Sequence, residues 1–422
     1  IHVTSKGLMW ATERYMREGC RRAVLAGEYG WDRTYRRPST KPPQYSICHL
    51  AGRLQSLSVL ATPRRQAHSV TKLVNNNLAT LESFTAWYDV EYSALAALRN
   101  CPKLTSLRLL RQYTESPTDF DALLAGAAKQ LRMVQLDNVP ASWISKLLHT
   151  ELPQLQSLEV WERPWERHRN LPPAEDWALV GRFTTLTSLA VHFEDDEKSD
   201  DTDECIVFFS SAVPWLSSLT DLTLSSNPGN LGRRDFPVTS WHLPNLRSFT
   251  HCLPSMSSIP VLRAPQLRRL AGNVFATELP ELMENCSALE ELGVRPEYST
   301  LSKGGGRPEN VAALVAQLRA GLDSEACQWK RTLRALRLQG PGVPAAVLQV
   351  LAEKLKALEQ VELPMPPYAS DVVTRFLLES LPRLESLRLD EEDGEYYGGE
   401  IDEDYDEDDD ESYSDEEGDD ED

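Results

Sequence analysis

A spacing of three leucines, LxxLxL, recurs along this chain and constrains its fold more than any other feature. The clearest copy is LTDLTL, which begins at Leu219. With Val, Phe or Ala allowed at the later leucine places, and with two frayed copies that end at His251 and Gly272, the copies begin at Leu54, Leu81, Leu104, Leu131, Leu155, Leu186, Leu219, Leu246, Leu267, Leu289, Leu333, Leu358 and Leu384. These 13 copies are separated by 12 steps that cover 330 residues, a mean of about 27.5. That mean lies inside the range of roughly 20–29 residues for leucine-rich repeats.

The two later apolar places stand two residues apart, which is the period of a β-strand, so both side chains point to one face. Amphipathic helical patterns lie between copies, with apolar residues three and four apart at 119–131, 309–322, 345–355 and 371–381. One strand and one helix cannot bury their apolar faces alone, whereas stacked neighbours can. The pattern therefore predicts an α/β leucine-rich-repeat solenoid over residues 46–389, a horseshoe of about 13 repeats. A parallel sheet would line its concave face, with the helices outside.

Several copies follow a Pro or Cys, as in NCPKLTSLRLL (Asn100–Leu110), LPQLQSLEV (Leu152–Val160), NCSALEELGV (Asn285–Val294) and LPRLESLRL (Leu381–Leu389). In this feature, and in the loss of most ladder asparagines, the repeats resemble those of F-box/leucine-rich-repeat proteins. The resemblance implies a non-enzymatic substrate-recognition subunit of an SCF-type ubiquitin ligase, which would hold a protein target on its concave face. The chain shows no F-box, the helical module that would contact the ligase core subunits.

Residues 1–45 precede the repeats. Their start, IHVTSKGLMW, is neither a signal peptide nor a Met start, so we expect a fragment or a processed chain whose true N-terminus, which could have held an F-box, is missing. Residues 7–27, GLMWATERYMREGCRRAVLAG, have a helical pattern. Residues 1–45 would either form a helical cap over the first repeat or follow a missing module. We favour the cap, because the ends of solenoids require one.

The residue between the two later leucine places, and the residue after them, point onto the concave sheet. These positions give the candidate partner-binding residues Leu60, Trp87, Arg108, Leu110, Gln135, Glu159, Trp161 and His192. Aromatic and Arg side chains together are typical of binding interfaces. In the alternative interpretation the tryptophans fold under loops and complete the core, with the three tryptophans of Trp161–Trp177 packing on each other.

The net charge of -20 is concentrated in the C-terminal segment 390–422, which holds 22 acidic residues and no Lys or Arg. By contrast, residues 1–72 hold 13 basic and four acidic residues. An acidic segment of this kind cannot bury enough apolar surface to fold, so we expect a disordered tail. It would attract histones, other basic proteins or the basic N-terminal region, or serve only to keep the protein soluble. Ser412 and Ser414 each precede an acidic residue by three places and are candidate phosphorylation sites.

Other function classes find little support. We see no nucleophile motif, no cofactor loop and no metal-ligand spacing, so we expect no enzyme, no cofactor and no metal. The seven scattered cysteines favour a reduced intracellular compartment, the cytoplasm or nucleus. No apolar window is long enough to cross a membrane, and the acidic charge argues against nucleic acid. Two alternatives stay open, a chaperone of histones or other basic proteins that acts through the tail, and a regulator of a small GTPase.

Overall fold

The computed structural model describes residues 21–25, 52–59, 67–87, 92–112, 117–162, 172–193, 201–226, 240–252, 261–272, 279–294, 308–325, 327–338, 345–364 and 370–390. Its strands are β1 (Arg22–Leu25), β2 (Ser56–Val59), β3 (Ser83–Ala86), β4 (Ser106–Leu110), β5 (Met133–Asp137), β6 (Ser157–Glu162), β7 (Ser188–Phe193), β8 (Asp221–Ser226), β9 (Ser240–His242), β10 (Ser248–Cys252), β11 (Val261–Arg263), β12 (Arg269–Gly272), β13 (Glu291–Val294), β14 (Ala335–Leu338), β15 (Gln360–Pro364) and β16 (Ser386–Asp390). Its α-helices are α2 (Ala67–Asn76), α3 (Tyr92–Leu98), α4 (Pro117–Ala127), α5 (Ala141–His149), α6 (Asp201–Ala212), α7 (Leu279–Asn285), α8 (Pro308–Asp323), α9 (Trp329–Thr332), α10 (Ala345–Lys354) and α11 (Ser370–Ser380), and two 3-10 helices are η2 (Ala174–Arg182) and η3 (Val213–Trp215).

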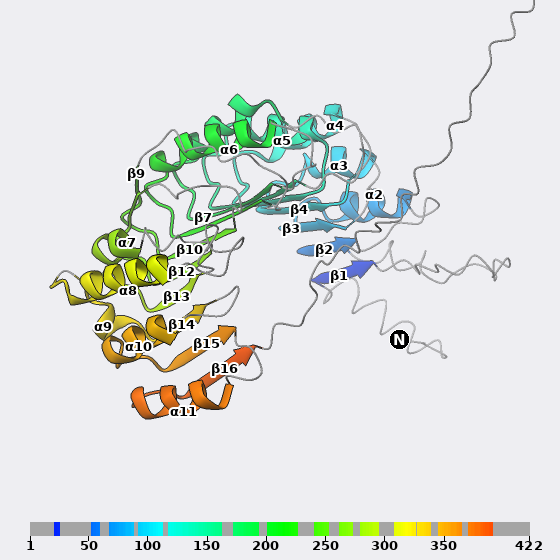
Figure 1. Ribbon diagram of the computed structural model, residues 1–422. Coiled ribbons are helices and arrows are strands. Elements are labelled where there is room, and N and C mark those ends of the chain that lie inside the picture. Colours follow the sequence, from blue (N-terminus) through cyan, green and yellow to red (C-terminus); the bar gives the residue numbers. More distant parts are fainter. Residues whose placement is uncertain are drawn as a thin grey trace, which may run out of the picture.

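One parallel sheet of 14 strands runs through the molecule in the order β1-β2-β3-β4-β5-β6-β7-β8-β10-β12-β13-β14-β15-β16. Counting the first leucine of each LxxLxL copy as place 1, each of the 13 predicted strands begins at place 3. The strands line the inside of a curved arc and the helices lie on its outside (Figure 1). The chain is an α/β leucine-rich-repeat solenoid, as the leucine spacing predicts.

A ladder of backbone carbonyls joins the repeats at the entrance to every strand. The carbonyl oxygen at place 2 accepts hydrogen bonds from two N–H groups of the next repeat, those at places 2 and 3. Gln55, for example, accepts from Glu82 and Ser83 at 2.8 and 2.9 Å. The same pair recurs at all 13 steps, from Arg21 to Glu359, with distances of 2.7–3.1 Å. Every repeat is therefore fixed in register against its neighbour by the same three atoms, one carbonyl oxygen and two amide nitrogens.

The core is a continuous layer of the leucines at places 1, 4 and 6. In the repeat that starts at Leu104, that residue, Leu107 and Leu109 all have 0% exposure. In the last described repeat, Leu384, Leu387 and Leu389 are only partly buried, because no further described repeat covers them. Burial of each leucine thus depends on a neighbour on both sides.

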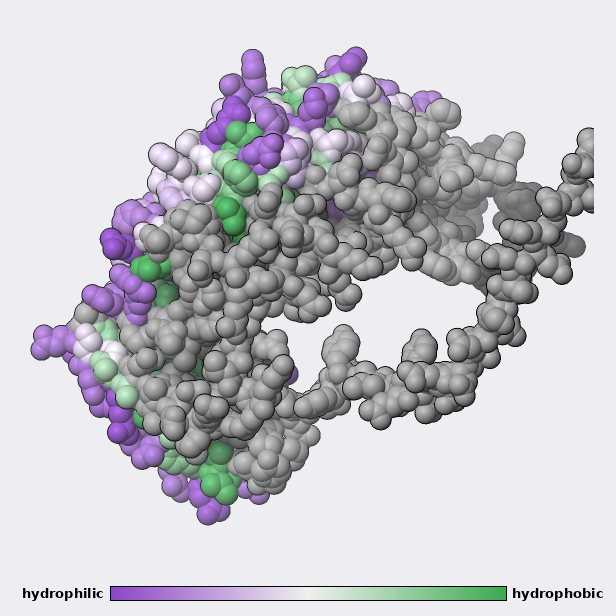
Figure 2. All heavy atoms as spheres, turned by 45° about the horizontal axis from the view of Figure 1, so that its top comes forward, coloured by the Kyte–Doolittle hydropathy of each residue, from purple (hydrophilic) through white to green (hydrophobic). Residues whose placement is uncertain are grey.

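The outer layer is more varied than the sequence predicts. Helices α4, α8, α10 and α11 form over the four predicted stretches. Between β8 and β12, however, the short strands β9 and β11 form a separate two-stranded parallel sheet. The step from Leu246 to Leu267 has only 21 residues, which leaves little room for a helix. Among the coloured residues of the face shown in Figure 2, hydrophilic ones are the more common, with apolar ones between them.

The predicted helix over residues 7–27 is wrong at its C-terminal part. Arg22–Leu25 forms strand β1, which pairs in parallel with β2. The register sets Ala23 opposite Leu57 and Leu25 opposite Val59, so these two residues occupy places 4 and 6 of a further repeat. Counting back sets place 1 at Cys20, outside the described residues. Pairing with the open edge of β2 satisfies backbone groups that a helix here would leave unpaired.

The two frayed copies compensate for each other. His251 occupies place 6 of β10 with 1% exposure and stacks on Phe249, ring centroids 5.2 Å apart. Gly272 stands opposite it on β12. A Cβ on Gly272 would lie 2.1 Å from the His251 carbonyl oxygen and 2.5 Å from its ring Cδ2, and the φ of Gly272 is +155°. The imidazole thus uses the space that a side chain at position 272 would need.

We predict that Gly272→Ala destabilises the solenoid by about 2–4 kcal/mol, because it adds overpacking to backbone strain. Gly293→Ala is the matched control on the next strand, since its Cβ would meet atoms no nearer than 3.6 Å. Urea unfolding of both variants measures the difference. Equal stability of the two would contradict the steric account.

Burial also lowers the pKa of His251 from 6.5 to about 4. The folded chain therefore binds fewer protons here than the unfolded chain below pH 6.5. The contribution of His251 to the free energy of unfolding is complete above that pH and is lost as the pH falls toward 4. Between about pH 7 and pH 4.5, protonation of this group lowers the free energy of unfolding by roughly 2–3 kcal/mol.

We predict that His251→Leu flattens this part of the pH dependence, measured as the difference in urea midpoints between the two pH values. If the variant loses as much stability on acidification as the unchanged chain does, His251 is not the source of the loss.

Candidate interaction surface on the inner face

The side chains at places 3, 5 and 7 leave the sheet on the face opposite the leucine core. Strand pairing sets equal places of neighbouring repeats side by side, so they form ladders across the arc. Arg108 stands between Thr85 and Gln135, and Gln135 stands opposite Glu159. Adjacent rungs lie about 4.8 Å apart. The predicted site residues Arg108, Gln135, Glu159, Trp161 and His192 are therefore brought onto one curved wall.

A connected polar and aromatic group lies at the centre of this wall. The side-chain amide of Gln135 donates to Glu159 Oε1 at 3.0 Å, and the indole N–H of Trp161 donates to the same oxygen at 2.5 Å. The Trp161 ring stacks on His192, with centroids 3.5 Å apart and an interplanar angle of 17°. His192 Nδ1 shares a hydrogen bond of 2.5 Å with the Ser225 hydroxyl. We name Gln135, Glu159, Trp161, His192 and Ser225 the inner-face cluster.

The inner-face cluster spans four strands, from β5 to β8, and each of its members holds the next. The Glu159 carboxylate fixes the indole, and the indole fixes the imidazole. All five side chains are half-buried rather than fully covered. A partner would therefore meet a surface that is already ordered, which lowers the entropy cost of binding.

Trp87 and Arg108 extend the wall toward the N-terminal end. Trp87 follows β3, where its backbone N–H donates to the Val59 carbonyl at 2.9 Å, and its side chain is 46% exposed. Three strand steps separate it from Trp161, a distance of about 14 Å. Arg108 is exposed, and its guanidinium contacts the Met133 sulfur at 3.6 Å. Two aromatic groups with a cation between them thus face the same hollow side of the arc.

One predicted site residue does not reach the surface, and three others lie outside the described residues. Leu110 is only 5% exposed, so the expectation that it presents an apolar group is wrong. Its strand ends in a turn at Arg111, whose φ is 57°, and the Gln112 side chain returns to bond the Leu110 carbonyl at 3.0 Å. Leu60, Ser412 and Ser414 lie outside the described residues.

The idea that the three tryptophans of Trp161–Trp177 pack on each other is wrong for the two that the structure describes. Trp177 is fully buried under the outer layer, with its ring 5.1 Å from Phe193 and 6.2 Å from Phe209. Trp161 lies on the inner face against His192. The sheet separates them, because Trp161 belongs to a strand and Trp177 to the 3-10 helix η2.

A repeated turn beside this surface was not predicted. Arg111 and Asn138 stand at place 8 of consecutive repeats, and both have positive φ, 57° and 55°. The Arg111 N–H donates to Asp137 O at 2.6 Å, and the Asn138 N–H donates to Trp161 O at 2.9 Å. Asn tolerates this conformation, which is the only signal the sequence offers. These bonds continue the strand ladder for one more residue. The first joins the end of β4 to β5, and the second joins the end of β5 to β6 at Trp161.

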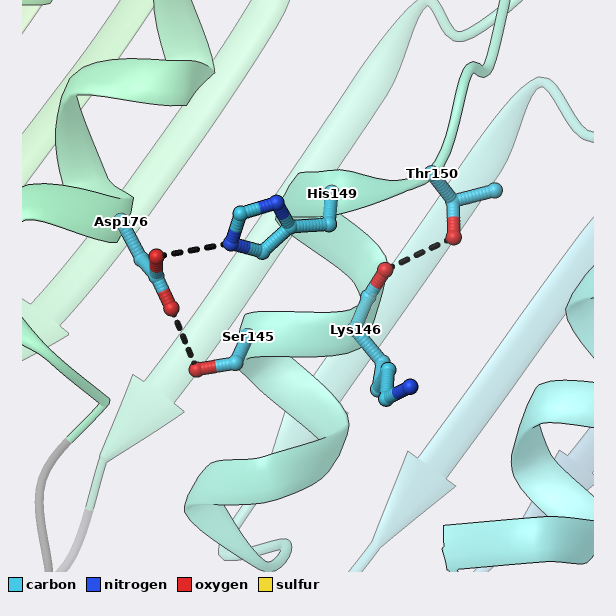
Figure 3. A network of polar contacts seen from close by, with 5 residues as sticks. All are labelled: Ser145, Lys146, His149, Thr150 and Asp176. Atoms are coloured by element: carbon cyan, nitrogen blue, oxygen red, sulfur yellow. Dashed lines mark hydrogen bonds and ion pairs between the residues drawn. The ribbon is translucent and has the colours of Figure 1, made fainter.

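A second polar cluster, on the outer layer, contains the residue types of a hydrolase triad. Asp176 on η2 is 7% exposed and accepts hydrogen bonds from the Ser145 hydroxyl at 2.6 Å and from His149 Nε2 at 2.8 Å (Figure 3). Serine and histidine both bind the carboxylate and not each other, so the imidazole cannot take the serine proton. The cluster ties α5 to η2 and has a structural role.

We predict that Asp176→Asn costs about 1–3 kcal/mol, because one of two donors loses its acceptor. Asp121→Asn is the control, since Asp121 forms an exposed ion pair with Lys146 at 3.2 Å and its loss should cost about 0–1 kcal/mol. Thermal unfolding separates the two. Equal shifts in melting temperature would show that the cluster adds nothing beyond a surface pair.

The described residues contain no group of three or more His, Cys, Asp or Glu side chains that could hold a metal ion. No described helix is long and apolar enough to cross a membrane.

Comparisons with known proteins give structural neighbours only. No family model and no curated protein matches the sequence. Among solved structures, the fold is similar to a chain of the Rad7–Elc1 complex from yeast, with a TM-score of 0.41, 14% identity and 74% of each chain covered. It is also similar to a leucine-rich-repeat protein of Leptospira interrogans, with a TM-score of 0.36, 16% identity, and 82% of this chain and 86% of that chain covered.

Proposed function

We propose that this protein is a non-enzymatic interaction solenoid that binds a protein partner on its inner face between β3 and β8. The observation that carries the proposal is the inner-face cluster. Its hydrogen bonds and its Trp161–His192 stack hold an aromatic surface in place on the concave side of the sheet. Ordered aromatic groups of this kind supply much of the energy of protein interfaces.

The charge of the wall favours a partner segment with basic groups. At places 3, 5 and 7 of β3 to β8, the charged side chains are Arg108, Asp137, Glu159 and Asp221. Three of these four side chains are acidic, and the Glu159 carboxylate lies against the Trp161 indole. A Lys or Arg of the partner would gain both carboxylate and ring-face contacts there.

As the finer proposal, the protein is the substrate-recognition subunit of an SCF-type ubiquitin ligase, with its target on the inner face and the ligase core subunits bound through an upstream F-box. The irregular repeats with Pro or Cys before the first leucine support it. We also propose that the protein works in the cytoplasm or nucleus. The thiols of Cys101, Cys286 and Cys327 are free and buried, which agrees with a reducing compartment.

We predict that Trp87→Ala and Trp161→Ala each weaken partner capture by at least about 30-fold, because each removes an anchor worth roughly 2 kcal/mol or more. Affinity purification followed by identification of the bound proteins measures capture, and ligase core subunits should be among them. Trp215→Ala is the matched control, since Trp215 lies on η3 in the outer layer and is 72% exposed.

Each variant is first checked by thermal unfolding. If both inner-face variants unfold, the two tryptophans belong to the core and the surface is assigned wrongly. An equal loss of capture in Trp215→Ala would move the binding surface to the outer layer. Capture of partners without any ligase subunit would leave the interaction role and exclude the ligase role.

A further inference from the structure

A basic hollow lies at the N-terminal end of the solenoid, away from the inner-face cluster. It has a volume of about 180 Å³ and is lined by Arg21, Arg53, Gln55, Thr80, Glu82 and Lys103. In repeat numbering, all six residues stand at place 2 or at the residue just before place 1. These two positions flank the first buried leucine, so they leave the core together at the rim where the chain enters the strands.

The three lining residues other than the cations, Gln55, Thr80 and Glu82, already form hydrogen bonds within the fold. The Thr80 hydroxyl donates to the Leu54 carbonyl at 2.8 Å, and the Gln55 amide donates to Glu82 Oε1 at 3.2 Å. The three cations differ from them. Arg21, Arg53 and Lys103 are exposed, and none of them forms an ion pair within the part of the chain that the structure describes.

At the other end of the arc, the charged residues of the same rim form ion pairs with each other. There the charged residues at place 2 pair across neighbouring strands, Arg268 with Glu290 at 3.2 Å and Arg334 with Glu359 at 3.0 Å. At the N-terminal end, three cations face the single carboxylate of Glu82. The basic hollow therefore has two positive charges that the described fold does not match.

We propose that the basic hollow is a binding site for carboxylates, and that its occupant is this chain's own acidic segment, residues 391–422. This inference does not depend on the proposed function. The segment holds 21 acidic residues and no Lys or Arg. Charge complementarity thus selects it over every other stretch of the chain.

The length of the segment permits the contact. Its 32 residues follow directly after β16, the last strand of the sheet. Fully extended they reach about 105 Å. The 13 steps across the 14-stranded sheet amount to only about 62 Å along the arc. Because the segment is joined to the solenoid, its effective concentration at the basic hollow is in the millimolar range, and a weak contact suffices to populate the bound form.

Zero-length carbodiimide cross-linking of the full chain tests the proposal, since it joins a Lys amine to a carboxylate only when the two are in contact. We expect Lys103 to be linked to residues within 391–422, as identified by peptide mass spectrometry. Lys129, which is also exposed, is the internal control and should show background linkage only. The Lys103 link should disappear at about 1 M NaCl, where charges are screened beyond about 3 Å.

Matched variants show whether the basic hollow itself holds the segment. Arg21→Gln together with Arg53→Gln should lower the Lys103 link several-fold. Arg132→Gln, an exposed place-2 arginine outside the lining, should leave it unchanged. Linkage of Lys103 no greater than that of Lys129, or an equal loss in both sets of variants, would overturn the proposal. So would links that join isotopically labelled to unlabelled chains in a mixture, because the occupant would then be a second copy.

Discussion

The place-2 carbonyl, with its two hydrogen bonds to the next repeat, is the contact on which the rest of this structure depends. It recurs without a break at all 13 steps, although the spacing between repeats varies from 21 to 44 residues. Loops and helices of any length can be inserted on the outside because this rim stays constant. The leucines behind it can then stack into one core, and the residues in front of it fall into ladders.

The sequence was sufficient to predict the strands because each depends on a local rule. Leucines two and three residues apart define a buried strand edge, and all 13 strands begin where that rule sets them. Strand β1 was missed because Cys20 stands at place 1, where all 13 copies have a leucine, so its pairing with β2 is visible only in three dimensions. The pair β9 and β11 was missed for a different reason. Each of these strands has only three residues and lies outside the LxxLxL copies.

The inner face was predicted less completely, because periodicity tells which way a side chain leaves the sheet but not what covers it. Trp87 is exposed as expected, whereas Leu110 is buried by a turn that no leucine spacing encodes. The stack of Trp161 on His192 depends on the rotamers of two residues 31 apart in sequence. The exchange of space between His251 and Gly272 likewise required the register of two strands.

Hydrogen–deuterium exchange of the unmodified chain, followed by peptide mass spectrometry, tests the central claim most directly. If a single carbonyl ladder unites the repeats, the amides at places 2 and 3 should exchange slowly in every repeat from Gln55 to Ser386. Their protection should exceed that of the outer-layer residues between them. Rapid exchange of these amides at an internal repeat, with slow exchange on both sides, would show separate cores and contradict the account.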